Sequence, residues 1–179
     1  MSRRSNEKAL VFQYGSNMST ARLNSSERLQ GDARPIGIAY TDENYDLLFD
    51  IWSTSNSCAA ADIVNGDKRI WGVVYEIPQW LVSREDSQLR KRKSLDAIEG
   101  EGTNYDRVSI RLRRPDGSVI SEAVETYIGR KRQPGITTAL HYVRHILEGL
   151  TEHKIPTEYM GYVKAQVLAN NPLLAADLS

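Results

Sequence analysis

The chain has 179 residues, which is enough for one domain with a sizeable core and too few for two domains of ordinary size. Lysine plus arginine and aspartate plus glutamate are equal at 23 each, so the chain lacks the broad positive field of a general nucleic-acid or membrane-surface binder. We therefore expect a small-molecule partner, no nucleic acid and no membrane.

A single cysteine, Cys58, excludes a disulfide within the chain and a cysteine-rich zinc site. We expect it to be a packed side chain in a protein of a reducing compartment. The polar residues 1–8 precede an apolar run too short for a signal peptide or a membrane span. The sequence thus predicts a cytoplasmic protein with a flexible N-terminus over 1–8, a single domain over 9–172 and a C-terminal tail over 173–179.

The N-terminal segment predicts a strand followed by a helix. Residues 9–14 form an apolar run, and 19–30 suit a short helix that Ser19 or Thr20 could cap. The peptide Tyr14-Gly15-Ser16-Asn17 lies at the junction, where backbone N–H groups and the helix start can hold an anion. A plain tight bend explains the same residues, and a phosphate loop is excluded because no Gly-x-x-x-x-Gly-Lys pattern is present.

The middle of the chain predicts four strands, each bounded by turn-forming residues. The turn signal Asn65-Gly66-Asp67 separates the last two, so we expect 59–64 and 70–77 to pair as a hairpin. The four strands are expected over 35–41, 45–52, 58–64 and 70–77.

After Pro78 the pattern changes to short helical segments, which are expected to end at Gly100, a typical residue just beyond a helix. A second hairpin is expected from the alternating segments 105–112 and 119–128, which turn at Pro115-Asp116-Gly117.

Two C-terminal helices are expected over 136–150 and 156–169, separated at Pro156. Hairpins with helices inserted between and after them favour an α+β domain built on a mixed, strongly curved sheet. A doubly wound fold is disfavoured because the regular alternation of strand and helix is missing.

Glu99 is the candidate general acid/base. Asp96 and Glu99 are both expected near a helix C-terminus, where the helix dipole disfavours negative charge and raises the pKa of a carboxyl. If an aromatic wall also desolvates it, Glu99 is suited to accept a proton and return it. The plain alternative is an exposed acid at a helix end.

Three other features are compatible with chemistry but favour plainer interpretations. His141 and His145 would share a helical face, yet His-Glu-x-x-His and a third ligand are missing, so no metal is expected. Ser16 lacks the Gly-x-Ser-x-Gly pattern of a nucleophile and has no identifiable base. The basic run 90–93 is typical of a solvated helix face rather than a local phosphate or nucleic-acid contact.

A series of short motifs follows in order along most of the chain. They are Tyr14-Gly15-Ser16-Asn17-Met18, Trp71-Gly72-Val73-Val74-Tyr75, Leu95-Asp96-x-x-Glu99-Gly100, Tyr105-x-Arg107, Tyr127, Pro134, Tyr142, Glu148-Gly149 and Ile155-Pro156-x-Glu158-Tyr159. This ordered series resembles the gamma-glutamylcyclotransferase family, whose fold is shared with AIG2-like proteins. Any one of the motifs would be weak, but the series is specific.

The resemblance implies a small mixed β-barrel with surrounding helices and a cavity at the barrel mouth. It also implies conversion of a gamma-glutamyl amino acid or amine to 5-oxoproline plus free amine by intramolecular aminolysis, without metal or cofactor. Glu99 matches the family's catalytic acid/base. The implied substrate-binding residues are Val11, Phe12, Gln13, Tyr14, Gly15, Ser16, Asn17, Tyr127 and Tyr142.

Two departures from the family pattern stand close to the site. Gln13 replaces a small residue, and Glu101 is a second acid beside Glu99. The leaving group is expected to contact loops around 40–58 and 100–105, which follow no family motif. A monomer and a homodimer both fit, and so does a non-catalytic member of the fold that binds a small ligand or a protein, since fold does not fix function.

Overall fold

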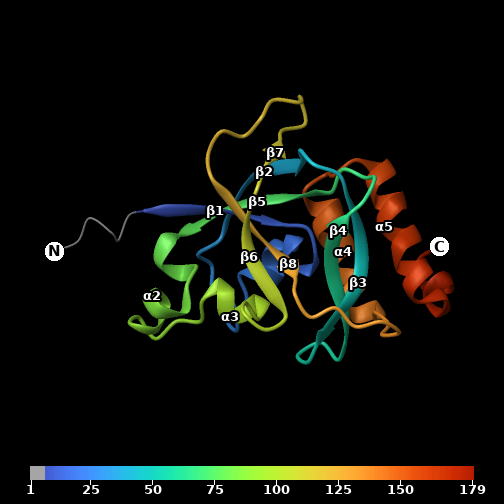
Figure 1. Ribbon diagram of the computed structural model, residues 1–179, viewed down its shortest axis with the longest axis horizontal. Helices are drawn as coiled ribbons and strands as arrows, with labels where there is room; N and C mark the ends of the chain where they lie inside the picture. The colour runs from blue at the N-terminus through green and yellow to red at the C-terminus, as the bar shows by residue number, and fades with distance from the viewer. Residues whose placement is uncertain (1–6) are drawn as a thin grey trace.

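The computed structural model describes residues 7–179, and a curled mixed sheet forms its centre (Figure 1). The strands are β1 (Lys8–Gln13), β2 (Arg34–Thr41), β3 (Tyr45–Ser53), β4 (Cys58–Asn65), β5 (Trp71–Pro78), β6 (Tyr105–Ile110), β7 (Leu112–Arg113) and β8 (Val124–Gly129). Six of them form one sheet in the order β6-β8-β1-β5-β2-β7, and β3 and β4 pair separately. Because β1 is parallel to β8 and antiparallel to β5, the sheet is mixed, as expected.

The two expected hairpins have different outcomes. The pairing of 105–112 with 119–128 is confirmed, since β6 and β8 are antiparallel with Tyr105 opposite Gly129, although β8 begins only at Val124. The pairing of 59–64 with 70–77 is wrong. The two edges of β5 are taken by β1 and β2, so β4 pairs instead with β3.

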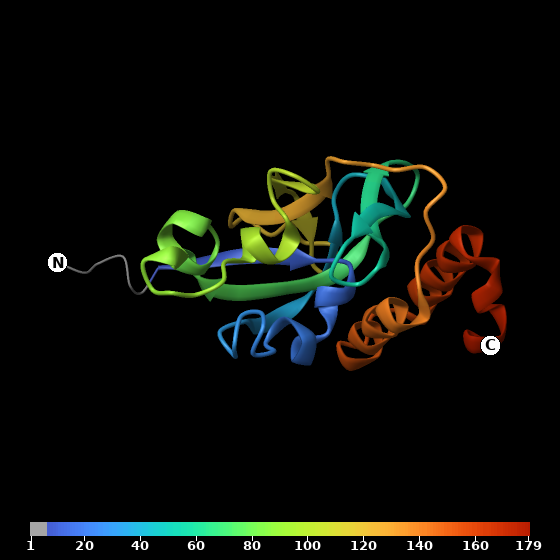
Figure 2. The same ribbon diagram turned by 90° about the horizontal axis from the view of Figure 1, so that it is seen from below.

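Helices surround the sheet on both sides (Figure 2). Seen as in Figure 2, α2 and α3 lie on one side of β1 and β5, while α1 and α4 lie on the other. The α-helices are α1 (Thr20–Leu23), α2 (Arg84–Gln88), α3 (Leu95–Glu99), α4 (Leu140–Glu152) and α5 (Thr157–Asn170), and the 3-10 helices are η2 (Ser16–Met18), η3 (Gln79–Leu81) and η4 (Pro172–Asp177).

The two C-terminal helices are confirmed as α4 and α5, but the helix expected over 19–30 is wrong in length. Ser19 does cap α1 by accepting from the Arg22 N–H at 3.3 Å. The helix then ends because the Asn24 side chain exchanges two 2.9 Å hydrogen bonds with the backbone of Ala33. That contact closes a loop in place of further helical turns.

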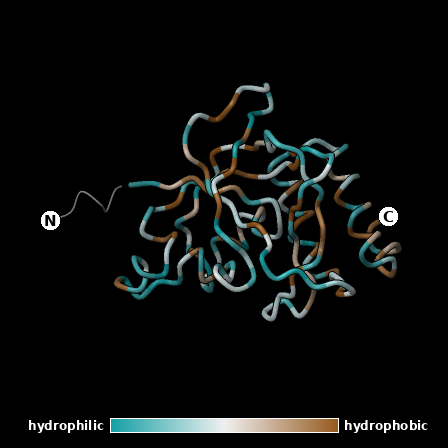
Figure 3. Tube along the Cα trace, viewed as in Figure 1, coloured by the Kyte–Doolittle hydropathy of each residue, from teal (hydrophilic) through white to brown (hydrophobic). Residues whose placement is uncertain are grey.

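The core lies between the sheet, the β3–β4 pair and α4, and apolar stretches follow the central strands in Figure 3. α4 packs on the short helix η2, where a Cβ added at Gly149 would lie 2.4 Å from Met18 Cβ. Gly149 therefore permits the close approach that fixes η2 and the loop before it. Cys58 is buried, in agreement with its expected packed position.

The two terminal segments expected to lie outside the domain are partly built into the fold. Residues 1–6 of the expected flexible N-terminus lie outside the described residues, while Lys8 already opens β1. Most of the expected tail at 173–179 belongs to η4, and Leu178 is buried. Over residues 7–179, every helix is too short or too polar to cross a membrane.

Candidate functional site

The loop after β1 carries a set of unused backbone donors. It turns through η2, where the Met18 N–H donates to Gly15 O at 3.0 Å. Within the described part of the chain, the backbone N–H groups of Gly15, Ser16 and Asn17 have no acceptor. The helix expected over 19–30, whose dipole was to act here, is preceded by the 3-10 turn η2 and is itself only Thr20–Leu23. Free amides, rather than a helix dipole, are thus the means by which this loop can hold an anion.

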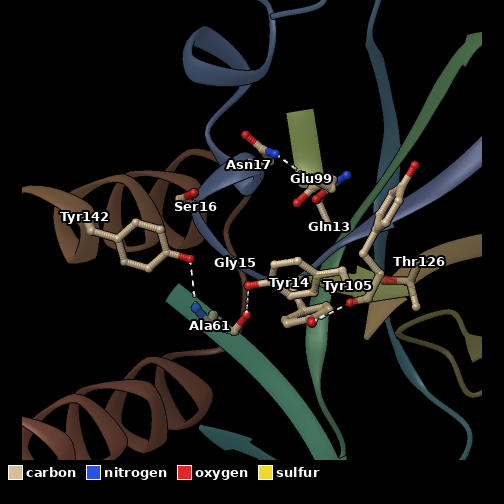
Figure 4. Close-up of a pocket in the computed structure, with 11 residues that line it drawn as sticks. Gln13, Tyr14, Gly15, Ser16, Asn17, Ala61, Glu99, Tyr105, Thr126 and Tyr142 are labelled. Atoms are coloured by element: carbon tan, nitrogen blue, oxygen red, sulfur yellow. Dashed lines mark hydrogen bonds between the residues drawn. The ribbon is translucent and has the colours of Figure 1, made fainter. Parts of the chain in front are cut away.

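Glu99 is placed by a single turn of helix, α3. Ser94 begins the helix by accepting from the Ala97 N–H at 3.0 Å, and Gly100 ends it in the left-handed region at φ 70°. Gly100 therefore confirms the expected helix stop. The Asn17 amide Nδ2 donates to Glu99 Oε1 at 2.7 Å, so the carboxylate faces the loop after β1 (Figure 4).

Burial raises the pKa of the Glu99 carboxyl. The Asn17 hydrogen bond, the positive charges of Arg28 and Arg22, and the Gln13 amide oppose that shift by favouring the ionised form. The direction agrees with the sequence prediction, and desolvation, the second of the two causes expected from the sequence, is the main one. α3 is only one turn long, so its dipole is small.

Tyrosines wall the cavity and are held by hydrogen bonds. Tyr14 donates to Tyr127 O at 2.6 Å, and Tyr105 donates to Ala61 O at 2.7 Å. The Tyr142 hydroxyl accepts from the Ala61 N–H at 2.9 Å. Burial raises the pKa of Tyr14, Tyr105 and Tyr142, so all three stay neutral and fixed near neutral pH.

Tyr127 lines the cavity, but its hydroxyl has a structural partner. It donates to Asp96 Oδ1 at 2.7 Å, and the Arg107 Nε lies 3.0 Å from the same oxygen. Asp96 is therefore a buried, paired carboxylate that orients Tyr127. This ties the Leu95-Asp96 and Tyr105-x-Arg107 motifs to one cluster behind the cavity wall.

Most of the site residues inferred from the sequence meet at one cavity of about 30 Å³. Val11 and Phe12 do not reach it, because their side chains are buried in the core on β1. Ala61, Tyr105 and Thr126 were missed as site residues; only Tyr105 had a signal, its place in a motif. The lining residues are Gln13, Tyr14, Gly15, Ser16, Asn17, Ala61, Glu99, Tyr105, Thr126, Tyr127 and Tyr142.

The two acids near the site are separated by the fold. Glu101, the second acid beside Glu99 in the sequence, pairs with Arg84 at 3.1 Å and does not line the cavity. Gln13, the departure from the family pattern, does line it and lies beside Glu99 in Figure 4. Glu99 is thus the one carboxylate among the lining residues.

The alternatives considered from the sequence find other partners. His141 Nε2 lies 2.8 Å from Asn56 O and His145 Nδ1 lies 3.3 Å from Glu148, and residues 7–179 contain no cluster of metal-ligating side chains. The Ser16 hydroxyl oxygen accepts from the Arg22 Nε at 3.2 Å. A guanidinium cannot take a proton from that hydroxyl, so this contact does not activate a nucleophile.

The basic run 90–93 is only partly the solvated face expected. Arg90 and Arg92 lie over the Trp80 ring, with the guanidinium carbon of Arg90 4.5 Å from its centre. Arg92 also donates to Asp32 at 2.8 Å. Cation–π contacts and an ion pair therefore hold part of the run against the protein.

A family model described as gamma-glutamyl cyclotransferase, AIG2-like, matches residues 11–145. The chain belongs to this family. A comparison of the sequence with curated proteins gives no match.

Solved structures share the fold at low sequence identity. A structure described as gamma-glutamyl cyclotransferase has a TM-score of 0.72 at 23% identity, covering 89% of this chain and 88% of that one. An uncharacterised protein from Homo sapiens gives 0.72 at 24%, with the same coverage. YkqA from Bacillus subtilis gives 0.69 at 22%, covering 91% of this chain but 55% of its own. These likenesses establish the α+β fold that the sequence predicts.

Proposed function

We propose that the protein is a gamma-glutamyl cyclotransferase that converts a gamma-glutamyl amide to 5-oxoproline and a free amine. The observation that carries this proposal is the position of Glu99. It is a desolvated carboxylate, bonded to Asn17, in a cavity that also contains the loop of free backbone amides. Family membership supports the same chemistry.

The substrate of such a reaction carries both reacting groups. Its α-amine attacks its own γ-carbonyl carbon, a new C–N bond closes the five-membered ring, and the bond to the departing amine breaks. The proton lost by the attacking nitrogen passes to Glu99 and from there to the departing nitrogen. Atoms balance without water, metal or an external nucleophile.

The cavity is suited to positioning as well as to proton transfer. Holding the amine against the carbonyl can be worth roughly 7–11 kcal/mol in favourable cases. The rigid tyrosines Tyr14, Tyr105 and Tyr142 would define the shape into which the substrate folds. Their hydrogen bonds fix that shape before the substrate arrives.

The loop after β1 would bind the negatively charged groups of the substrate. The N–H groups of Gly15 and Ser16 are free to stabilise the developing oxyanion or to hold the α-carboxylate of the gamma-glutamyl group. Gln13, Asn17, Tyr127 and Tyr142 would contact the same group. Val11 and Phe12 would act only by supporting the loop from within the core.

The test is release of 5-oxoproline from a panel of gamma-glutamyl amino acids, gamma-glutamyl amines and glutathione, measured by mass spectrometry. Glu99→Gln protein is the matched control, because its amide oxygen can still accept from Asn17. We expect product from the unaltered protein alone. No product from any substrate with folded protein would reject the proposal and favour a ligand-binding member of the family.

A further inference from the structure

A wider cleft of about 280 Å³ lies next to the inner cavity and shares Glu99 with it. Its outer wall is the turn between β3 and β4, from Trp52 to Asn56, together with Gly100 and Asn104 beyond α3. These segments fall within the loops around 40–58 and 100–105, which are expected from the sequence to contact the leaving group. A substrate with its γ-carbonyl beside Glu99 could therefore extend its departing amine into this cleft.

The charge lining this cleft is strongly unbalanced. Arg22, Arg28 and Lys93 line it, and Glu99 is its one acidic residue. Arg22 binds only neutral oxygens, Ser16 Oγ at 3.2 Å and Asn56 Oδ1 at 2.9 Å. Within residues 7–179, Arg28 and Lys93 form no ion pair.

Arginines elsewhere in the molecule are usually neutralised. Arg34, Arg92 and Arg113, for example, each contact a carboxylate. At the cleft, by contrast, burial and repulsion from Arg28 lower the pKa of Arg22. Three cations close to a single carboxylate, Glu99, leave an excess of positive charge whose repulsion a bound anion would relieve.

The formal charges limit what the bound anion can be. Three cations and an ionised Glu99 leave two positive charges at the cleft. The α-carboxylate of a gamma-glutamyl group would neutralise one of them, and its attacking amine is uncharged. One positive charge then remains for the departing group.

We propose that this cleft is a leaving-group subsite in which Arg28 and Lys93 select gamma-glutamyl amides whose departing amine carries a carboxylate. The proposal rests on the cyclotransferase function above and deepens it. A neutral amine leaves the cleft charge unbalanced, and a cationic amine such as a diamine increases the repulsion. Arg22 also donates to Ser16 in the loop after β1, so Arg28 and Lys93 are the two positions at which charge can be removed without losing that contact.

The experiment compares two substrates that differ only in charge at the departing end, gamma-glutamylglycine and gamma-glutamylglycinamide. kcat/KM for 5-oxoproline release is measured for the unaltered protein and for the double variant Arg28→Gln Lys93→Gln. Arg114→Gln is the matched control, since Arg114 is an exposed arginine near Glu122 that does not line the cleft.

We expect the unaltered protein to prefer the carboxylate substrate by about tenfold or more, the size of one charge-assisted hydrogen bond. In the double variant the ratio of kcat/KM for gamma-glutamylglycine to kcat/KM for the amide should fall to near one. Both rates are measured at a pH where activity no longer rises with pH, because Arg28 also favours the ionised form of Glu99. Arg114→Gln should keep the preference. Higher salt should weaken the preference of the unaltered protein.

Two outcomes would overturn the subsite while leaving the cyclotransferase intact. Equal kcat/KM for the two substrates would mean that the departing charge is not recognised. A double variant that keeps the full preference, with or without a loss of rate, would mean that Arg28 and Lys93 do not hold the departing carboxylate. Absence of 5-oxoproline from both substrates and from the wider panel would instead overturn the function and the subsite together.

Discussion

The Asn17 side-chain amide donates a 2.7 Å hydrogen bond to Glu99 across a sequence separation of 82 residues. Asn17 belongs to the loop that leaves β1, and Glu99 is the last residue of α3. This contact therefore joins the two motifs on which the proposed chemistry depends. It also favours the ionised form of a carboxylate whose pKa is raised by burial.

Glu99→Gln should preserve the fold and lower turnover by at least about a thousandfold, because the proposed reaction has no other group to transfer the proton. The free energy of unfolding should be unchanged or higher, since an amide replaces a desolvated carboxylate. Thermal unfolding and 5-oxoproline release measure the two effects. A folded Glu99→Gln protein with normal turnover would contradict the role of Glu99.

The pH dependence of kcat/KM should have an acidic limb set by Glu99. The base must be ionised, so activity should fall as the pH drops through a pKa that burial holds above the usual value for glutamate. Asn17→Ala removes a hydrogen bond to the ionised form and should move that limb to higher pH. A limb that stays in place or moves to lower pH in Asn17→Ala would argue against this coupling.

Gly149→Ala should destabilise the protein by about 1–3 kcal/mol, because the new methyl group would overlap Met18. Its Cβ would lie 2.4 Å from Met18 Cβ and 2.9 Å from Ser19 N, so η2 and the loop after β1 would also shift and turnover should fall. Gly161→Ala on α5 is the matched control, with open space around the added methyl. Thermal unfolding that is equally affected by both changes would contradict the close packing of α4 on η2.

Asp50→Asn should increase stability at pH 8 and reduce its dependence on pH. Burial and the neighbouring Asp62 carboxylate raise the pKa of Asp50 from 3.8 to about 6. An acid with a raised pKa in the folded state binds its proton more tightly there, so stability is lost as the pH rises from about 4 to about 6.

Above that range, ionised Asp50 should cost about 1–3 kcal/mol, which the asparagine removes. Arg132 would keep its 2.7 Å contact with Asp62. Denaturant unfolding at pH 4 and pH 8 is the measurement, and a variant that loses stability at pH 8 would show that Asp50 is stabilised by its partners rather than strained.

The sequence alone predicted those helices, strands and helix ends that depend on residues close together along the chain. The strand at β1, the cap at Ser19, the stop at Gly100 and the two C-terminal helices follow from apolar runs, hydroxyl caps and a glycine in the left-handed region. The ordered motifs also indicated the family. These features depend on neighbours within a few positions, so the chain specifies them without tertiary context.

Pairing and helix length needed the whole fold. Nothing local indicates that β5 has both edges occupied, which is why β4 pairs with β3 rather than with β5. Likewise, α1 ends because the Asn24 side chain bonds to the backbone of Ala33, nine residues further along the chain. Strand pairing and the end of α1 therefore depend on contacts between segments that are separated in the sequence.

For the candidate site, too, some residues were indicated by the sequence and others only by the tertiary structure. The sequence by itself indicated Glu99 and the Tyr14–Asn17 loop as candidates for the proposed chemistry, and it left the leaving-group side as unassigned loops. Only the tertiary structure brought Ala61, Thr126 and the cations Arg22, Arg28 and Lys93 to the site, and only it showed that burial perturbs Glu99. The physical reason is that desolvation and electrostatic fields depend on distances in space, which motifs read along the chain do not contain.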